Sequence, residues 1–65
     1  MKIEYNNLVL VCEKKNGYFE CKLLKRNELL TKITLDEFGG TVYLSPKGEV
    51  RVDIGKPFNV EFEWE

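Results

Sequence analysis

The sequence predicts a single all-β domain over residues 1–65, built as a small antiparallel meander of six or seven short strands that forms a barrel or a sandwich. Apolar and polar residues alternate in short runs, and turn-forming residues separate these runs at regular intervals. At most one helical turn is expected, near 35–38. A composition of 43% hydrophobic and 32% charged residues is typical of a globular chain.

The first two turns are expected at pairs of turn-forming residues. Asn16-Gly17 favours a two-residue type I′ hairpin, because both central residues of that turn need a positive φ. In this register Cys12 lies opposite Cys21, and one face carries the apolar residues Leu8, Leu10, Cys12, Phe19, Cys21 and Leu23. Asn6-Asn7 allows another tight turn that places Tyr5 opposite Leu8, and a bulged continuous strand is the alternative.

The middle of the chain is expected to continue the meander. A three-residue loop, 26–28, would join Lys25 to Leu29, set Leu24 opposite Leu30, and extend the core face through Leu29, Thr31, Ile33 and Leu35. Thr34 and Glu37 have the spacing of a capping box, which suggests a short helical turn that ends at 39–40.

The C-terminal part contains a second clear hairpin. A three-residue loop, 46–48, with Gly48 in the left-handed region would set Leu44 opposite Val50 and place on one face Val42, Leu44, Val50, Val52 and Ile54. Residues 55–57 then turn the chain into a last strand, whose apolar residues alternate with polar ones and are Phe58, Val60, Phe62 and Trp64.

The two cysteines would lie opposite each other at a non-hydrogen-bonded site, where Cα atoms are about 4.5 Å apart. A disulfide can bridge that distance. The N-terminus shows no long apolar run, so we expect neither a signal peptide nor a membrane span, and a cytoplasmic location. Thiols stay reduced there. We therefore expect Cys12 and Cys21 to be reduced core residues, with the disulfide as the alternative.

The sequence offers little for chemistry. It has no histidine, a single serine at Ser45, and no glycine-rich phosphate loop. Two cysteines without histidine do not make a structural zinc site. The carboxylates on the last strand, Glu61, Glu63 and Glu65, are explained by an alternating solvent face. We expect no enzymatic activity, no metal and no cofactor.

A second apolar patch suggests binding. Val9, Val11, Leu24 and Leu30 would lie on the face opposite the core, with Tyr18 nearby and a rim formed by Glu13, Lys15, Glu20, Lys22 and Lys32. The sequence thus favours a small non-enzymatic protein-binding module and a homo-oligomer, most simply a dimer. The specific form we expect is a phage- or mobile-element-encoded inhibitor that covers the surface of a host defence enzyme.

The alternative is a single-stranded nucleic-acid or nucleotide-binding domain of OB-like or SH3-like layout. Such domains combine aromatic stacking platforms with basic residues. Tyr18, Tyr43, Lys15, Lys22 and Lys32 would form that site. The formal net charge of −1 makes nucleic acid the less favoured partner.

Overall fold

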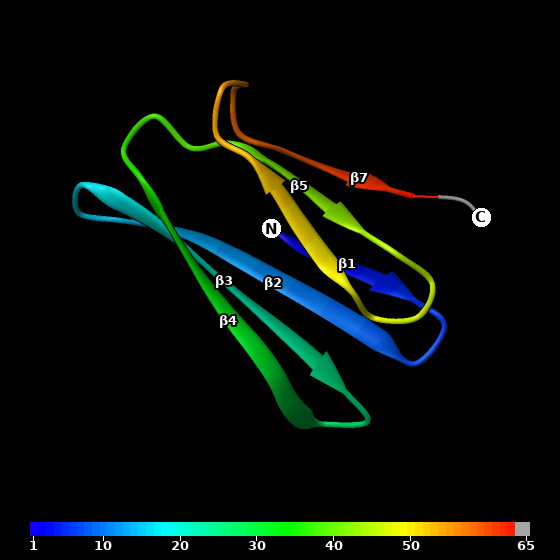
Figure 1. Ribbon diagram of the computed structural model, residues 1–65. Coiled ribbons are helices and arrows are strands. Elements are labelled where there is room, and N and C mark those ends of the chain that lie inside the picture. Colours follow the sequence, from blue (N-terminus) through cyan, green and yellow to red (C-terminus); the bar gives the residue numbers. More distant parts are fainter. Residues whose placement is uncertain (64–65) are drawn as a thin grey trace.

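The computed structural model describes residues 1–63 and contains seven strands and no helix in that range. The strands are β1 (Lys2–Tyr5), β2 (Leu8–Lys15), β3 (Tyr18–Lys25), β4 (Glu28–Asp36), β5 (Thr41–Leu44), β6 (Val50–Asp53) and β7 (Asn59–Phe62). They form a four-stranded sheet in the order β1-β2-β3-β4 and a three-stranded sheet in the order β6-β5-β7 (Figure 1). The predicted all-β class is confirmed, with two sheets in place of a closed barrel.

The first two hairpins have the predicted registers. Tyr5 pairs with Leu8, and Cys12 pairs with Cys21. The turn at Asn16-Gly17 has two residues, but only Gly17 has a positive φ, at +87°. The predicted type I′ turn is therefore wrong, because that turn needs a positive φ at both positions, and the observed sign pattern is that of a type II turn.

The β3–β4 connection is one residue shorter than predicted. Arg26 and Asn27 both have a positive φ and form a two-residue turn, so Leu24 pairs with Leu29 and not with Leu30. A bulge between Leu23 and Leu24 then inserts Leu30 and restores the predicted register, with Leu23 opposite Thr31. The predicted pairing of Leu24 with Leu30 is wrong, since a tight turn followed by a bulge replaces the wider loop.

The expected helical turn near 35–38 is not present. β4 continues through Thr34 to Asp36, so Thr34 cannot act as a helix cap. The chain turns because the Asp36 carboxylate accepts a hydrogen bond from the Phe38 amide (3.0 Å), and the Asp36 carbonyl accepts one from the Gly39 amide (3.0 Å). An aspartate-directed turn has replaced the capping box.

The second sheet confirms the β5–β6 hairpin, with Leu44 opposite Val50 and Gly48 at a positive φ. β7, however, crosses to the free edge of β5 and pairs with it in parallel, so the C-terminal part is not a meander. Ile54, expected on the core face, is 79% exposed in the β6–β7 turn. Trp64, predicted to continue the alternation of β7, lies outside the described residues.

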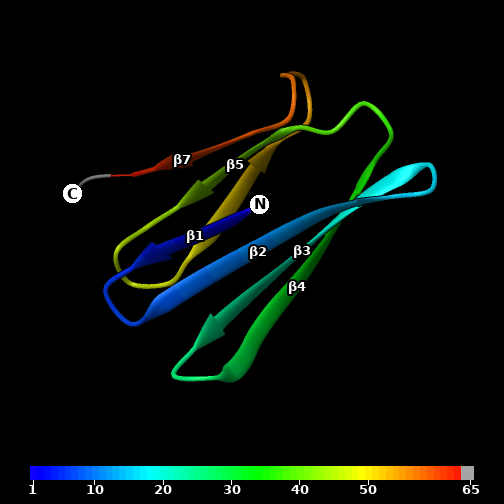
Figure 2. The same ribbon diagram turned by 180° about the vertical axis from the view of Figure 1, so that it is seen from behind.

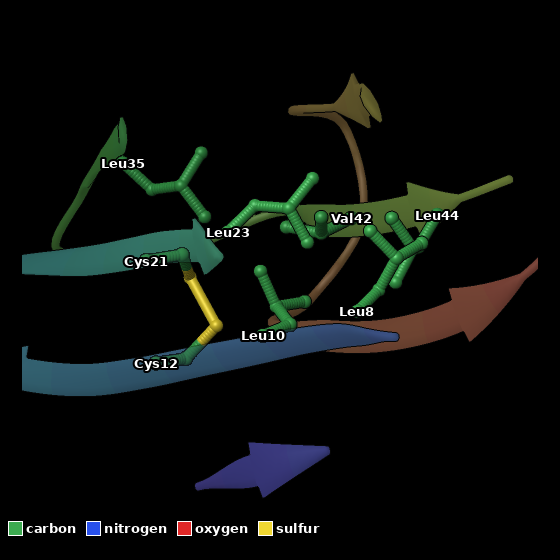
Figure 3. Close-up of a cluster of buried hydrophobic side chains, with 8 residues drawn as sticks. All are labelled: Leu8, Leu10, Cys12, Cys21, Leu23, Leu35, Val42 and Leu44. Carbon is green, nitrogen blue, oxygen red and sulfur yellow. A yellow bond between two sulfur atoms is a disulfide. The ribbon is translucent and has the colours of Figure 1, made fainter. Parts of the chain in front are cut away.

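The core lies between the two sheets. Figure 3 shows it as a cluster of eight buried residues: Leu8, Leu10, Cys12, Cys21, Leu23, Leu35, Val42 and Leu44. The stacked rings of Phe19 and Phe58 (4.5 Å between centroids) and the tilted ring contact of Tyr5 with Phe62 (4.9 Å) join the sheets at their margins.

Cys12 and Cys21 form a disulfide across β2 and β3 (Figure 3). The expectation of reduced thiols is therefore wrong for this structure. The predicted geometry was right, since the two Cα atoms are 4.1 Å apart. The Cys12 amide and carbonyl bond to Met1 on the other side of β2, which places the cysteine pair at a non-hydrogen-bonded site of the β2–β3 ladder.

Candidate protein-binding surfaces

The outward face of the four-stranded sheet brings together three of the predicted binding residues. Val9, Val11 and Leu24 alternate with buried core residues and therefore point away from the second sheet. Val9 pairs directly with Leu24, as predicted. All three side chains are half-buried, and within residues 1–63 no second layer covers this face. The three residues form a small apolar area.

Ion pairs surround this patch. Glu20 lies between Lys32 (3.3 Å) and Lys22 (3.8 Å), and its side chain is only 16% exposed. Lys15 bonds Glu13 at 3.2 Å. The hydrogen bond from Lys32 lowers the pKa of Glu20, with further help from the charge of Lys22, while the hydrogen bond to Glu13 raises the pKa of Lys15. The rim of the patch therefore consists of paired charges, in which three lysines contact two glutamates.

The other two predicted partner-binding residues lie elsewhere. The bulge carries Leu30 toward the β5–β6 turn, where one of its methyl groups lies near Gly48 and close to Leu8. Tyr18 is exposed but pairs with Lys15 and Asp36, at the opposite end of β3 from Leu24. The structure therefore separates Leu30 and Tyr18 from the patch.

Four of the five predicted nucleic-acid residues, Lys15, Tyr18, Lys22 and Lys32, share the outward face of the four-stranded sheet, as predicted, and Tyr43 is separated from them. Tyr43 lies between the buried residues Val42 and Leu44, so it faces outward from the three-stranded sheet. The alternation of β3 turns Lys22 outward from the four-stranded sheet, on the other side of the molecule. Lys15, Lys22 and Lys32 each contact a glutamate. The five residues do not form one surface.

Tyr43 instead has a cationic environment of its own. The Arg51 guanidinium lies 4.4 Å from the Tyr43 ring centroid and contacts Glu63 at 2.7 Å. Lys56 donates a hydrogen bond to the Tyr43 hydroxyl (3.0 Å), and this bond, together with nearby Asp53, raises the pKa of Lys56. Cation–π contact and ion pairing hold the two cations, so this cluster stabilises the outer surface of the second sheet.

The sequence reasoning missed the two most exposed large apolar residues of the part of the chain that the structure describes. Phe38 is 78% exposed in the β4–β5 turn, and Ile54 is 79% exposed in the β6–β7 turn. Both turns lie at the same end of the molecule (Figure 1 and Figure 2). A Cβ added to Gly40 would lie 3.4 Å from the Ile54 Cα, so the turns are neighbours. We call Phe38 and Ile54 the apical pair.

Both turns of the apical pair are held by short hydrogen bonds. Asp36 fixes the Phe38 turn, as described above, and the Asp53 carboxylate accepts a bond from the Gly55 amide at 3.1 Å. The Thr41 hydroxyl donates to the Pro57 carbonyl at 3.0 Å and joins the β6–β7 connection to β5. Hydrogen bonds within the fold therefore support the backbone that carries the two exposed side chains.

A sequence signal for the apical pair was present. Phe38 and Ile54 each stand between an aspartate and a glycine, in the segments Asp-Glu-Phe-Gly (36–39) and Asp-Ile-Gly (53–55). Aspartate and glycine favour turns. A large apolar residue inside such a segment cannot belong to the inward face of a strand, and this identifies it as a candidate contact residue.

The opposite end has a more polar concavity. An open pocket of about 460 Å³ is lined by residues of the β1–β2 and β5–β6 turns and by Lys25, and its lining is Asn6, Asn7, Leu8, Lys25, Pro46 and Lys47. Within residues 1–63 there is no group of three or more cysteine, aspartate or glutamate side chains arranged to hold a metal ion. The same range contains no helix that could span a membrane.

No family model matches the chain, and neither the curated proteins nor the solved structures include a match to it.

Proposed function

We propose that this chain is a small protein-binding module that acts by covering part of a partner's surface. The observation that carries the proposal is the apical pair, in which the two most exposed large hydrophobic residues among residues 1–63 lie on neighbouring, internally hydrogen-bonded turns. Exposed apolar side chains cost free energy in water, and grouped ones usually mark an interaction site.

The rigidity of the turns supports binding without refolding. An interface that is ordered in advance loses less conformational entropy when the partner binds. Phe38 is an aromatic residue, and aromatic residues are enriched in the buried centre of interfaces. Burying a side chain the size of Phe or Ile contributes about 1.5–3 kcal/mol. A dissociation constant of about 1 µM corresponds to a binding free energy of about 8 kcal/mol, and two such side chains would supply a substantial part of it.

The charges beside the apical pair favour a protein over a lipid surface. Asp36, Glu37 and Asp53 flank the two side chains, and Lys56 is the cation that contacts this group, through Asp53. Anionic membranes would repel an acidic rim. We therefore propose a partner with an apolar pocket bordered by basic residues, and inhibition of an enzyme by occlusion is the form of this activity that the sequence favours.

Two double variants test the proposal. Phe38→Ser/Ile54→Ser removes the apical pair, and Val9→Lys/Leu24→Lys changes the outward patch of the four-stranded sheet. The chain and both variants are immobilised and exposed to extract from cells that encode the chain, and the retained protein is then purified for calorimetry. We expect loss of binding only in the apical variant. Binding that survives the apical variant, or the absence of any retained protein, would contradict the proposal.

Whether the chain binds nucleic acid, the alternative function, is tested by a separate measurement. Fluorescence anisotropy of labelled single-stranded oligonucleotides at two salt concentrations measures it, because phosphate contacts make the affinity strongly dependent on salt. The ion pairs at Lys15, Lys22 and Lys32 lead us to expect no binding even at low salt.

A further inference from the structure

β4 is one of the two outer strands of the four-stranded sheet and, with nine residues, the longest strand described. Such an edge can accept another strand through backbone hydrogen bonds. The bulge lies near the start of β4, so Lys32–Asp36 form a regular segment. Exposed apolar surface is present beside this segment, since Leu29 is 57% exposed.

The direction of the backbone groups on β4 follows from the disulfide pair. Cys12 bonds to Met1, so Cys12 and Cys21 do not exchange backbone hydrogen bonds with each other. The Cys21 amide and carbonyl must then face β4, where Cys21 pairs with Ile33. Because the direction alternates along a strand, the amides and carbonyls of Lys32 and Thr34 point away from β3, along the free edge.

The sequence of this edge is complementary to itself in one antiparallel register. If two copies pair with Thr34 opposite Thr34, then Lys32 of each copy lies opposite Asp36 of the other, and Ile33 lies opposite Leu35. Opposite charges, paired threonines and paired apolar residues are all favourable cross-strand neighbours. A register centred on Lys32 would oppose two lysines, which is unfavourable.

The side chains also match by face. Ile33 is half-buried and Leu35 is buried, and both point toward the core side of the sheet. Lys32, Thr34 and Asp36 are exposed on the outward side. In the register centred on Thr34, each residue meets a residue on the same face, so the core side of one copy continues into that of the other.

We infer that two copies of this chain associate through their β4 edges, in the antiparallel register centred on Thr34, to form a continuous eight-stranded sheet. The paired segment is short, so the dimer should be weak and should form at high protein concentration. This inference does not depend on the apical pair, because the contacts that define the register lie within Lys32–Asp36.

Sedimentation equilibrium between 10 µM and 1 mM tests this inference. The apparent mass should rise from 7.6 kDa toward twice that value. Thr34→Pro removes the central amide donor at an edge position where proline is tolerated, and it should remain monomeric. Thr34→Val keeps the amide and should still dimerise. Circular dichroism checks that both variants are folded.

Asp36→Asn provides a variant that keeps the aspartate-directed turn, since asparagine forms the same turn. It removes two cross-strand ion pairs and should raise the dissociation constant roughly 2- to 30-fold. Phe38→Ser/Ile54→Ser should leave dimerisation unchanged, so the two proposals can fail separately.

Amide hydrogen exchange gives a result for each residue without mutation. The Thr34 amide should exchange quickly at 10 µM and become protected at 1 mM, whereas the Ile33 amide should be protected at both concentrations. A chain that stays monomeric at 1 mM, or Thr34 protection that does not depend on concentration, would overturn the inference.

Discussion

Reduction of the Cys12–Cys21 disulfide should destabilise this domain strongly. The two cysteines are nine residues apart in the sequence and buried in the core. The loop-closure relation for a loop of that length gives a contribution of about 2.6 kcal/mol, which acts by restricting the unfolded chain. A domain of this size has a total stability of about 3–5 kcal/mol. The bond therefore supplies roughly half or more of that stability.

Urea denaturation followed by circular dichroism measures this effect. The free energy of unfolding of a small domain falls by about 1 kcal/mol for each molar increase in urea concentration. Reduction should therefore lower the urea concentration at the unfolding midpoint by about 2–3 M. The control is Cys12→Ala/Cys21→Ala, whose midpoint should not respond to the reductant. The reasoning would be refuted if the oxidised and reduced chains had the same midpoint, or if mass spectrometry found two free thiols in the protein before reduction.

Two further predictions concern the ion pairs and the turns. Glu20→Gln should lower the free energy of unfolding at pH 7, and the loss should be smaller at pH 3. Because the pKa of Glu20 is lowered in the folded state, its stabilising contribution is fully present above the ordinary glutamate pKa of about 4.3 and is lost as the pH falls through the folded-state pKa. An equal loss at both pH values in urea titrations would contradict this. Gly39→Ala should lower the melting temperature more than Gly17→Ala, although both positions have a positive φ, because the new Cβ would lie 2.7 Å from the Phe58 Cβ at Gly39 and in open space at Gly17. Strain from φ costs about 1–2 kcal/mol at each site, so equal losses would show that the Phe58 contact is unimportant.

Local sequence determined the hairpins. Two tight turns at 6–7 and 16–17 and a three-residue loop at 46–48 each join runs of alternating residues, and in each case the predicted register is observed. A shift of one residue would move the apolar side chains of a strand to the wrong face, so turn length and alternation specify the register together. The opposition of Cys12 and Cys21 follows from the same reasoning.

Contacts between distant segments decided where β7 pairs, which the predicted meander had wrong. β7 joins β5 in parallel because the free edge of β5 lets Phe62 contact the Tyr5 ring, while Phe58 stacks on Phe19 from the start of the same segment. The alternation of β7 shows that one face is buried, but it contains no information about which neighbour buries it.

The candidate site divides in the same way. The alternation of the sequence correctly predicted that Val9, Val11 and Leu24 share one outward face, because the face on which a side chain lies depends only on its strand and on the register with the neighbouring strand. The displacement of Leu30 and the exposure of Phe38 and Ile54 depend on a bulge and on two turns brought together by the packing of the sheets. The sequence by itself determined which residues share a strand face. Only the tertiary structure decided which turns became neighbours, since that choice is made by burial of the common core and not by any local preference of the chain.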